Sequence, residues 1–334
     1  MILTQDAKIP ALRQGDLEEK LRRCLVAKGL ASPGIPIDIR LLKHKPGKQA
    51  VAWVCFPAGG GDRQLILKLS RKGRGRSIYQ KMRWLWEAGK CSSVKAEGGM
   101  PEPLCYLPEL DGILMTKVEG RAFDAQVPVR IQNQWVRAAA QALAWLHTLP
   151  LPEDGVFPRR SWPFWVEKFA LKARQTLADR LPAQAEATLV QVFAELDKAG
   201  LSVEGETRIC HGDYSPTQLL FQDRRAVILD FDSAAITWPE LDLANFLLSL
   251  RTHLKDRFAQ LATAFLEVYT SWHGFSDRLL NRFLALALVR RLVIEVKAAP
   301  VVEGRAEEAL ALALDLLSNT KQWQCLLQPL PAIG

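Results

Sequence analysis

The chain has 334 residues, of which 49% are hydrophobic and 24% are charged, and its net charge at pH 7 is +8. At roughly 100–200 residues per domain, this length predicts two domains or lobes, each with ample apolar material for a core. Six scattered cysteines, none of them in a CxxC pair, indicate neither a disulfide framework nor a zinc site.

Several features exclude a secreted or membrane-spanning protein. The N-terminus has no basic stretch followed by an apolar run, so no secretory signal peptide is predicted. The most apolar helical stretch, residues 283–296, contains Arg290 and Arg291 and is too short and too charged to span a bilayer. Together with the unpaired cysteines, this pattern favours a cytoplasmic protein with no membrane partner.

The first third of the chain is expected to form a sheet with one helix. Residues 1–35 form a helical lead-in, with a helix over 12–27 that ends at Ser32-Pro33-Gly34. Short turns then separate strand-like runs, so the strands are antiparallel. A helix is predicted over 77–88. The five predicted strands cover residues 37–42, 50–56, 64–69, 103–107 and 112–118.

The rest of the chain is mostly helical. Helices are predicted over 131–149, 164–181 and 183–199, and again from residue 241 to about 326. A strand-rich island over 208–235 interrupts them. The fold class is therefore α+β and bilobal. A small antiparallel-sheet lobe spans residues 1–117, and a larger helical lobe spans residues 118–334.

Much of the excess positive charge lies between Arg63 and Arg83. This segment is either a site for a polyanion, such as nucleic acid or nucleotide phosphates, or a solvated surface. No nucleic-acid-binding motif accompanies the charge, so a nucleic-acid partner is not expected.

The island contains the groups that phosphoryl transfer requires. Asp213 and Asp230 each flank a short predicted strand. Asp213 follows Ile209-Cys210-His211-Gly212, and Asp230 comes directly after the apolar run 226–229. Gln218 precedes a second apolar run, and a hairpin through 222–225 would bring Gln218 close to Asp230. Phosphoryl transfer needs a group that orients the attacking hydroxyl and a magnesium ion held against the phosphates. One carboxylate and one amide oxygen are suitable magnesium ligands, and a separate carboxylate can accept the proton.

The order and spacing of four short motifs resemble the signature of the aminoglycoside phosphotransferase and choline kinase family. The motifs are His211-Gly212-Asp213, Gln218, Asp230-Phe231-Asp232 and Asp242-Leu243-Ala244. Weaker matches extend the resemblance to roughly residues 37–250. It implies a protein-kinase-like fold and the transfer of the γ-phosphate of ATP, or GTP, to a hydroxyl. The acceptor would be a small molecule such as a sugar, an amino alcohol or an aminoglycoside.

The resemblance also implies roles for residues of the island. Asp213 would be the catalytic base that positions the acceptor hydroxyl. Gln218 and Asp230 would bind Mg²⁺. His211 and Asp242 would brace the catalytic loop by hydrogen bonds, and Asp242 is also expected to be the N-cap of the following helix.

In the sheet lobe, the resemblance implies a nucleotide site. Lys68 would contact the α- and β-phosphates, and the backbone of Thr116 and Val118 would hold the adenine edge. Lys45, in the first turn, could offer its charge to phosphate. The family's glutamate partner for Lys68 is missing from the middle of the helix, so Glu87 is either that partner or a surface residue.

Four further residues are open to two interpretations. Asp232 either stands near the metal or caps the following turn, and His147 is expected to be structural rather than catalytic. Arg290 and Arg291 either face the helical-lobe pocket, which would favour an anionic or sugar-like acceptor, or lie at the surface with an ion pair to Glu295.

Two other functions remain open from the sequence. Because the family usually has Asn where Gln218 stands, one alternative is a pseudokinase that binds nucleotide without turnover. The other is a basic nucleic-acid-binding protein that uses the 63–83 segment. The identity of the acceptor and the oligomeric state do not follow from the sequence.

Overall fold

The computed structural model describes residues 6, 8–9, 12, 17–91, 99–177, 179–199, 205–298, 304–318 and 322–327. The chain forms two compact units. The first comprises residues 1–95, 99–120 and 227–232, and the second comprises residues 96–98, 121–226 and 233–334. A short stretch from far along the chain, residues 227–232, therefore belongs to the first unit.

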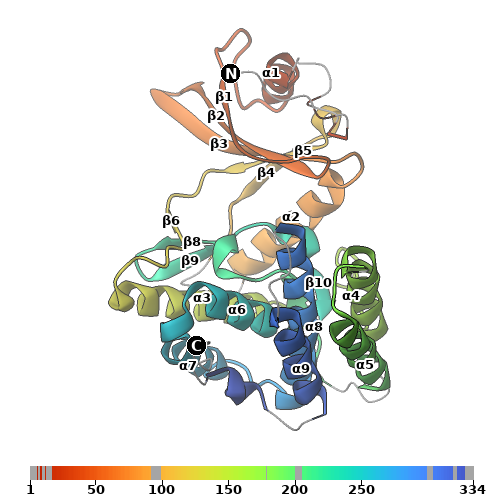
Figure 1. The fold of residues 1–334 in the computed structure, drawn as a ribbon. Coiled ribbons are helices and arrows are strands. Elements are labelled where there is room, and N and C mark those ends of the chain that lie inside the picture. Colours follow the sequence, from red (N-terminus) through yellow and green to blue (C-terminus); the bar gives the residue numbers. More distant parts are fainter. Residues whose placement is uncertain are drawn as a thin grey trace. The chain divides into compact units, whose positions relative to one another are not determined.

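The first unit is built on a five-stranded antiparallel sheet with the strand order β1-β2-β3-β5-β4 (Figure 1). This confirms the predicted sheet. The strands are β1 (Asp38–Lys45), β2 (Gln49–Ala58), β3 (Gly61–Ser70), β4 (Pro103–Leu107) and β5 (Gly112–Thr116).

Alternation of apolar residues gives this sheet one buried face. In β2, alternate residues from Ala50 to Phe56 are buried, and they join a core cluster with residues of β3 and β5. The lead-in helix α1 (Leu17–Ala27) places Leu21 and Leu25 in the same cluster. Of the helix predicted over 12–27, residues 13–16 lie outside the described residues. Helix α2 (Gly75–Cys91) packs against β4 and β5, and the short 3₁₀ helix η2 covers Pro108–Leu110.

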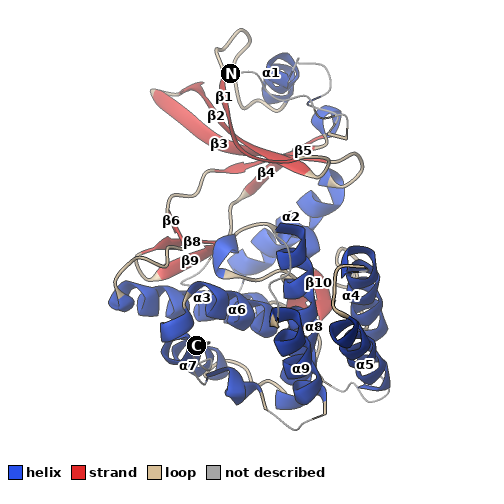
Figure 2. Cartoon of the chain, in the orientation of Figure 1, coloured by secondary structure: helices blue, strands red, loops and turns tan. Residues whose placement is uncertain are grey.

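The second unit is mostly helical, as the sequence predicted (Figure 2). Helix α3 packs against α7, and α8 packs against α4, α6 and α9, so α8 is central to the unit. The helices are α3 (Val129–Thr148), α4 (Trp162–Leu177), α5 (Ala183–Ala199), α6 (Glu240–His253), α7 (Phe258–Thr270), α8 (Asp277–Ala298) and α9 (Arg305–Leu317). The 3₁₀ helices η6 (Lys255–Arg257) and η7 (Trp323–Leu327) lie in this unit as well.

The island between α5 and α6 forms short strands and turns. Strand β7 (Arg208–Cys210) pairs with β10 (Ala235–Thr237), and β6 (Arg121–Ala122), β8 (Leu219–Gln222) and β9 (Arg225–Ile228) form a second small sheet. The predicted β8–β9 hairpin is thereby confirmed. The 3₁₀ helices η4 (Pro216–Gln218) and η5 (Phe231–Ser233) adjoin these strands. No helix in the described ranges is long and apolar enough to cross a membrane.

Candidate active site

A buried carboxylate fixes the loop that follows β7. Asp242 is fully buried, and its side chain accepts hydrogen bonds from the backbone N–H of His211 at 2.6 Å and of Gly212 at 2.8 Å. The Nε2 atom of His147 lies 3.3 Å from the same carboxylate. A buried carboxylate that accepts several hydrogen bonds holds its partners firmly, because an unpaired polar group in the interior is costly. The loop from His211 to Asp213 is therefore rigidly placed.

The structure corrects the expected N-cap role of Asp242. Helix α6 begins at Glu240 with Pro239 as its N-cap, so Asp242 lies in the first helical turn. A proline lacks an N–H donor and suits a helix start. The side chain of Asp242 is thereby left to bond the loop after β7 instead of its own helix.

His147 is part of the same buried network. Its Nδ1 atom lies 2.8 Å from the hydroxyl of Tyr269, and its ring is fully buried. Burial lowers the pKa of His147, although the carboxylate of Asp242 opposes the shift. A neutral, doubly hydrogen-bonded imidazole in this place supports the loop and has no access to a ligand.

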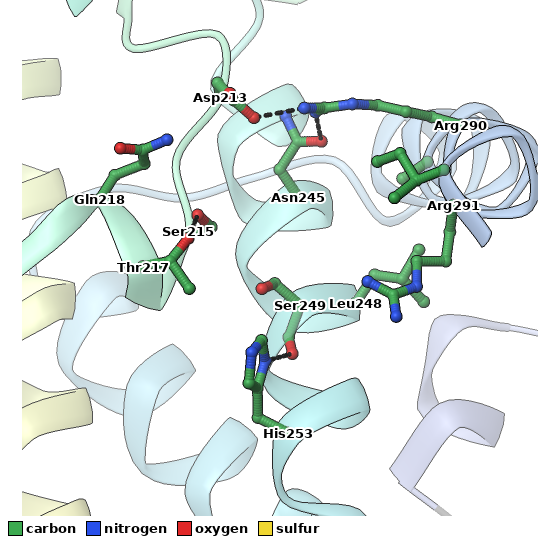
Figure 3. A pocket seen from close by; sticks show the side chains of 12 residues that line it. Asp213, Ser215, Thr217, Gln218, Asn245, Leu248, Ser249, His253, Arg290 and Arg291 are labelled. Atoms are coloured by element: carbon green, nitrogen blue, oxygen red, sulfur yellow. Dashed lines mark hydrogen bonds and ion pairs between the residues drawn. The ribbon is translucent and has the colours of Figure 1, made fainter. Parts of the chain in front are cut away.

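Asp213 opens into a cavity of about 350 Å³ within the second unit (Figure 3). Its backbone N–H donates to Nδ1 of His211 at 3.3 Å, so the loop orients it. Arg290 of α8 donates one guanidinium N–H to the Asp213 carboxylate and another to Oδ1 of Asn245, the latter at 2.9 Å. Nine residues that line the cavity are polar or charged: Asp213, Ser215, Thr217, Gln218, Asn245, Ser249, His253, Arg290 and Arg291.

The cavity lining combines site residues predicted from the sequence with one residue, Asn245, that was not predicted. Asp213 and Gln218 are both lining residues, as their positions in the island suggest. Asn245, three residues after Asp242, was missed, although its helical spacing places it one turn further along the same helix. Arg291 ion-pairs with Glu295 at 2.7 Å, whereas Arg290 turns to Asp213, so the two arginines have different partners.

In the first unit, Lys68 of β3 meets two carboxylates. Its side chain is 7% exposed, and its ammonium donates to Oδ1 of Asp230 at 2.7 Å and to Asp232. Burial by itself would lower the pKa of Lys68, but the charges of Asp232 and Asp230 outweigh it and raise the pKa above its usual value. Asp230 has a left-handed backbone with φ of 65°, a conformation uncommon for residues other than glycine.

This arrangement settles one alternative that the sequence left open, the role of Glu87, and gives Asp232 a partner. Glu87 is exposed on α2 and lies 3.7 Å from Lys90, so it is a surface residue, while Lys68 contacts Asp230 and Asp232. Asp232 lies in η5 and contacts the Lys68 ammonium. Burial raises the pKa of Asp232, and the charge of Lys68 acts in the opposite direction.

The candidate nucleotide-binding backbone lies at the end of β5. The Thr116 N–H donates to the Glu102 carbonyl at 3.0 Å, so only the carbonyl of Thr116 suits the hinge hypothesis. Val118 follows in an irregular segment. Lys45 is exposed at the end of β1, next to a turn whose Gly47 N–H donates to Asp6 at 2.7 Å. This contact with Asp6 joins residues 41 positions apart and is not predictable from a local pattern.

The sequence profile of a family described as "Phosphotransferase enzyme family" matches residues 56–276. The chain belongs to this family. No curated protein matches the chain significantly.

Solved structures of phosphotransferases share the fold. The crystal structure of aminoglycoside phosphotransferase APH(4)-Ia has a TM-score of 0.63 and 15% identity, over 91% of this chain and 99% of that chain. Macrolide 2′-phosphotransferase MphH from Brachybacterium faecium has a TM-score of 0.57 and 17% identity, over 89% of this chain and 98% of that chain. The sequence resemblance to this family and the predicted α+β kinase-like fold are both confirmed.

The carboxylates of this phosphotransferase fit a magnesium ion. Asp230 and Asp232 place two negative charges beside the single positive charge of Lys68, so the cluster keeps a net negative charge. Magnesium prefers oxygen ligands and few protein groups. Carboxylate oxygens of this cluster therefore suit Mg²⁺, and the amide of Gln218 as a second ligand stays a prediction.

Glycine at position 212 of this phosphotransferase is required by both backbone conformation and space. Its φ is 77°, and an added Cβ would lie 2.5 Å from the carbonyl oxygen of Ser233. We expect Gly212→Ala to lower the free energy of unfolding by about 2–4 kcal/mol and to displace Asp213, with a loss of activity. Chemical denaturation measures the first effect.

Gly155→Ala is the matched control, because Gly155 has φ of 70° but no atom within 4 Å of an added Cβ. This control isolates backbone strain, about 1–2 kcal/mol. Equal destabilisation by the two variants would show that the contact with Ser233 does not matter.

Proposed function

We propose that the chain transfers the γ-phosphate of ATP, or of GTP, to a hydroxyl group of a small molecule. One observation carries the proposal: Asp213, held by the loop that Asp242 braces, faces a cavity of about 350 Å³ with room for an acceptor. Membership of the phosphotransferase family supports the reaction class. The six cysteines, all free thiols, support our further proposal of a cytoplasmic protein.

The proposed reaction uses Asp213 as the group that accepts a proton. The acceptor hydroxyl donates a hydrogen bond to the Asp213 carboxylate, which orients its oxygen toward the γ-phosphorus. A bond forms between that oxygen and phosphorus, the bond from phosphorus to the bridging oxygen breaks, and the hydroxyl proton passes to Asp213. The nucleoside diphosphate leaves with the bridging oxygen.

The first unit carries the groups proposed to bind the nucleotide. Lys68 would donate to the α- and β-phosphates, since it already binds oxyanions of Asp230 and Asp232. The carbonyl of Thr116 and the N–H of Val118 would bind the purine, and Lys45 would lie near phosphate. Structures similar to this chain were crystallised with AMP-PNP, ADP or GDP, which supports a nucleotide donor.

Magnesium, with Asp230 and Gln218 as proposed ligands, would neutralise charge on the phosphate oxygens. A pseudokinase would retain nucleotide binding without transfer, and a nucleic-acid-binding protein would ignore nucleotide. Calorimetry with ATP and GTP, with and without Mg²⁺, tests this part of the proposal. We expect Mg²⁺-dependent binding, and no binding of either nucleotide would overturn the assignment.

Substitution of Lys68 tests its proposed contact with phosphate. We expect Lys68→Met to weaken ATP binding by at least about tenfold, because a hydrogen bond to a charged group contributes about 1.5–3 kcal/mol. Lys43→Met is the control, since Lys43 is exposed on the same sheet. If Lys68→Met binds ATP as tightly as the wild type while keeping its fold, Lys68 does not contact the nucleotide.

A further inference from the structure

Two arginines and one carboxylate line the cavity beside Asp213. Among the described residues that line it, Arg290 and Arg291 are cationic and Asp213 carries the sole negative charge. Arg291 is compensated by Glu295, which ion-pairs with it at 2.7 Å outside the lining. Within the described part of the chain, Asp213 is the one carboxylate that ion-pairs with Arg290. Each carboxylate near the lining is thus already paired with an arginine, so a cationic ligand finds no unpaired carboxylate among these residues, whereas the guanidinium of Arg290 can also bind an anion.

The guanidinium of Arg290 is oriented and still has donors to offer. Two of its N–H groups bond the Asp213 carboxylate and Oδ1 of Asn245 (Figure 3). A guanidinium has five N–H donors in a planar fork that matches the geometry of a carboxylate or phosphate. Arg290 can therefore bind an oxyanion while it remains in contact with Asp213.

Asn245 provides a second donor at the same place. The residue is 8% exposed and lines the cavity, and its Oδ1 accepts from Arg290. That bond fixes the amide orientation, and its buried Nδ2 has no hydrogen-bond partner among the described residues. A buried amide donor without a partner is costly, so a ligand that accepts from it is favoured.

Arg290 also interacts electrostatically with Lys168. The ammonium of Lys168 on α4 lies 4.4 Å from the centre of the Trp165 ring. Burial, together with the positive charges of Lys172, Arg290 and Arg160, lowers the pKa of Lys168 to about 8, while the charge of Asp213 opposes the shift. A bound anion beside Arg290 would relieve part of the repulsion among these positive charges.

We propose that the acceptor of this phosphotransferase carries a carboxylate or phosphate group, which Arg290 and Asn245 bind. The inference rests on the proposed function, because it assigns this cavity to the acceptor. Arg290 contacts Asp213 directly, so hydrogen bonds of about 2.8 Å place the anionic group about 3–6 Å from the reacting hydroxyl. Polycationic acceptors such as aminoglycosides are disfavoured by the same charges.

Inorganic phosphate and matched acceptors test this specificity. Phosphate binding is measured by calorimetry, and transfer from ATP is compared for two series. The first is ethanolamine, glycerol and glycerate, and the second is glucosamine, glucose and glucuronate. We expect phosphate to bind, and within each series we expect kcat/KM to be highest for the anionic member.

Substitutions in α8 test whether phosphate binding and the preference for anionic acceptors depend on the cavity. Arg290→Gln should weaken phosphate binding by at least about tenfold and abolish the preference for anionic acceptors, because a charged hydrogen bond is lost. Arg290→Lys keeps the positive charge, so it should restore part of the phosphate affinity and part of the preference for anionic acceptors. Arg278→Gln, an equal charge change on the exposed part of α8, should leave both within about twofold.

The possible failures can be distinguished. If Arg290→Gln binds phosphate as the wild type does, or if transfer favours the cationic member, the inference is wrong even though phosphotransfer is real. If phosphate binding depends on Arg290 but no compound accepts phosphate from ATP, the anion site stands and the proposed function fails.

Discussion

Replacing Asp213 by Asn is expected to lower kcat and kcat/KM together by at least about 100-fold, while ATP affinity stays within about twofold. The amide keeps an oxygen that can accept from Arg290, so the loop and the cavity stay intact. The substitution removes the negative charge and the group that accepts the proton. Both matter mainly in the transition state, where the hydroxyl loses its proton.

A comparison with Asp230→Asn distinguishes the proposed role of Asp213 as the base from that of Asp230 as a metal ligand. Asp230 contacts Lys68 in the first unit, so its substitution should also weaken Mg²⁺-dependent nucleotide binding. Asp223→Asn, in the exposed hairpin turn of the same island, is the neutral control. If Asp213→Asn keeps a near-normal kcat, or fails only through lost nucleotide affinity, the roles of base and metal ligand are wrongly assigned.

Replacing Asp242 by Ala is expected to lower the free energy of unfolding by about 3–5 kcal/mol and to abolish turnover. The fully buried carboxylate accepts from the N–H groups of His211 and Gly212, and its loss leaves both donors unpaired in the interior. His147 loses a partner as well. The loop that positions Asp213 would then lose its main support.

Urea denaturation measures this loss. Glu308→Ala is the control, because Glu308 is an exposed acid in the first turn of α9 and contributes at most about 1 kcal/mol through the helix dipole. An Asp242→Ala protein as stable as the control would show that the buried bonds to the loop contribute little.

The sheet and the island could be predicted because their signals are local. Alternation along β2 marks a strand with one buried face, and short turns require antiparallel neighbours. The spacing from His211 to Asp242 marks the family. These patterns depend on residues close together in the chain, so no tertiary information was needed.

The partners of charged residues could not be predicted because they depend on tertiary structure. Lys68 meets Asp232, 164 residues later, instead of the glutamate that was sought on α2. Two adjacent arginines on a helix point about 100° apart, but the sequence does not say which one contacts Asp213. Only the packing of α8 against α6 brings Arg290 to Asn245 and Asp213.

The most direct test of the central claim is transfer of labelled γ-phosphate from ATP to an acceptor panel in the presence of Mg²⁺. The panel contains sugars, hydroxy acids, amino alcohols and aminoglycosides. The account predicts a labelled product with the wild type, and a loss of at least about 100-fold with Asp213→Asn. Nucleotide binding without transfer to any acceptor, or equal transfer by Asp213→Asn, would contradict it.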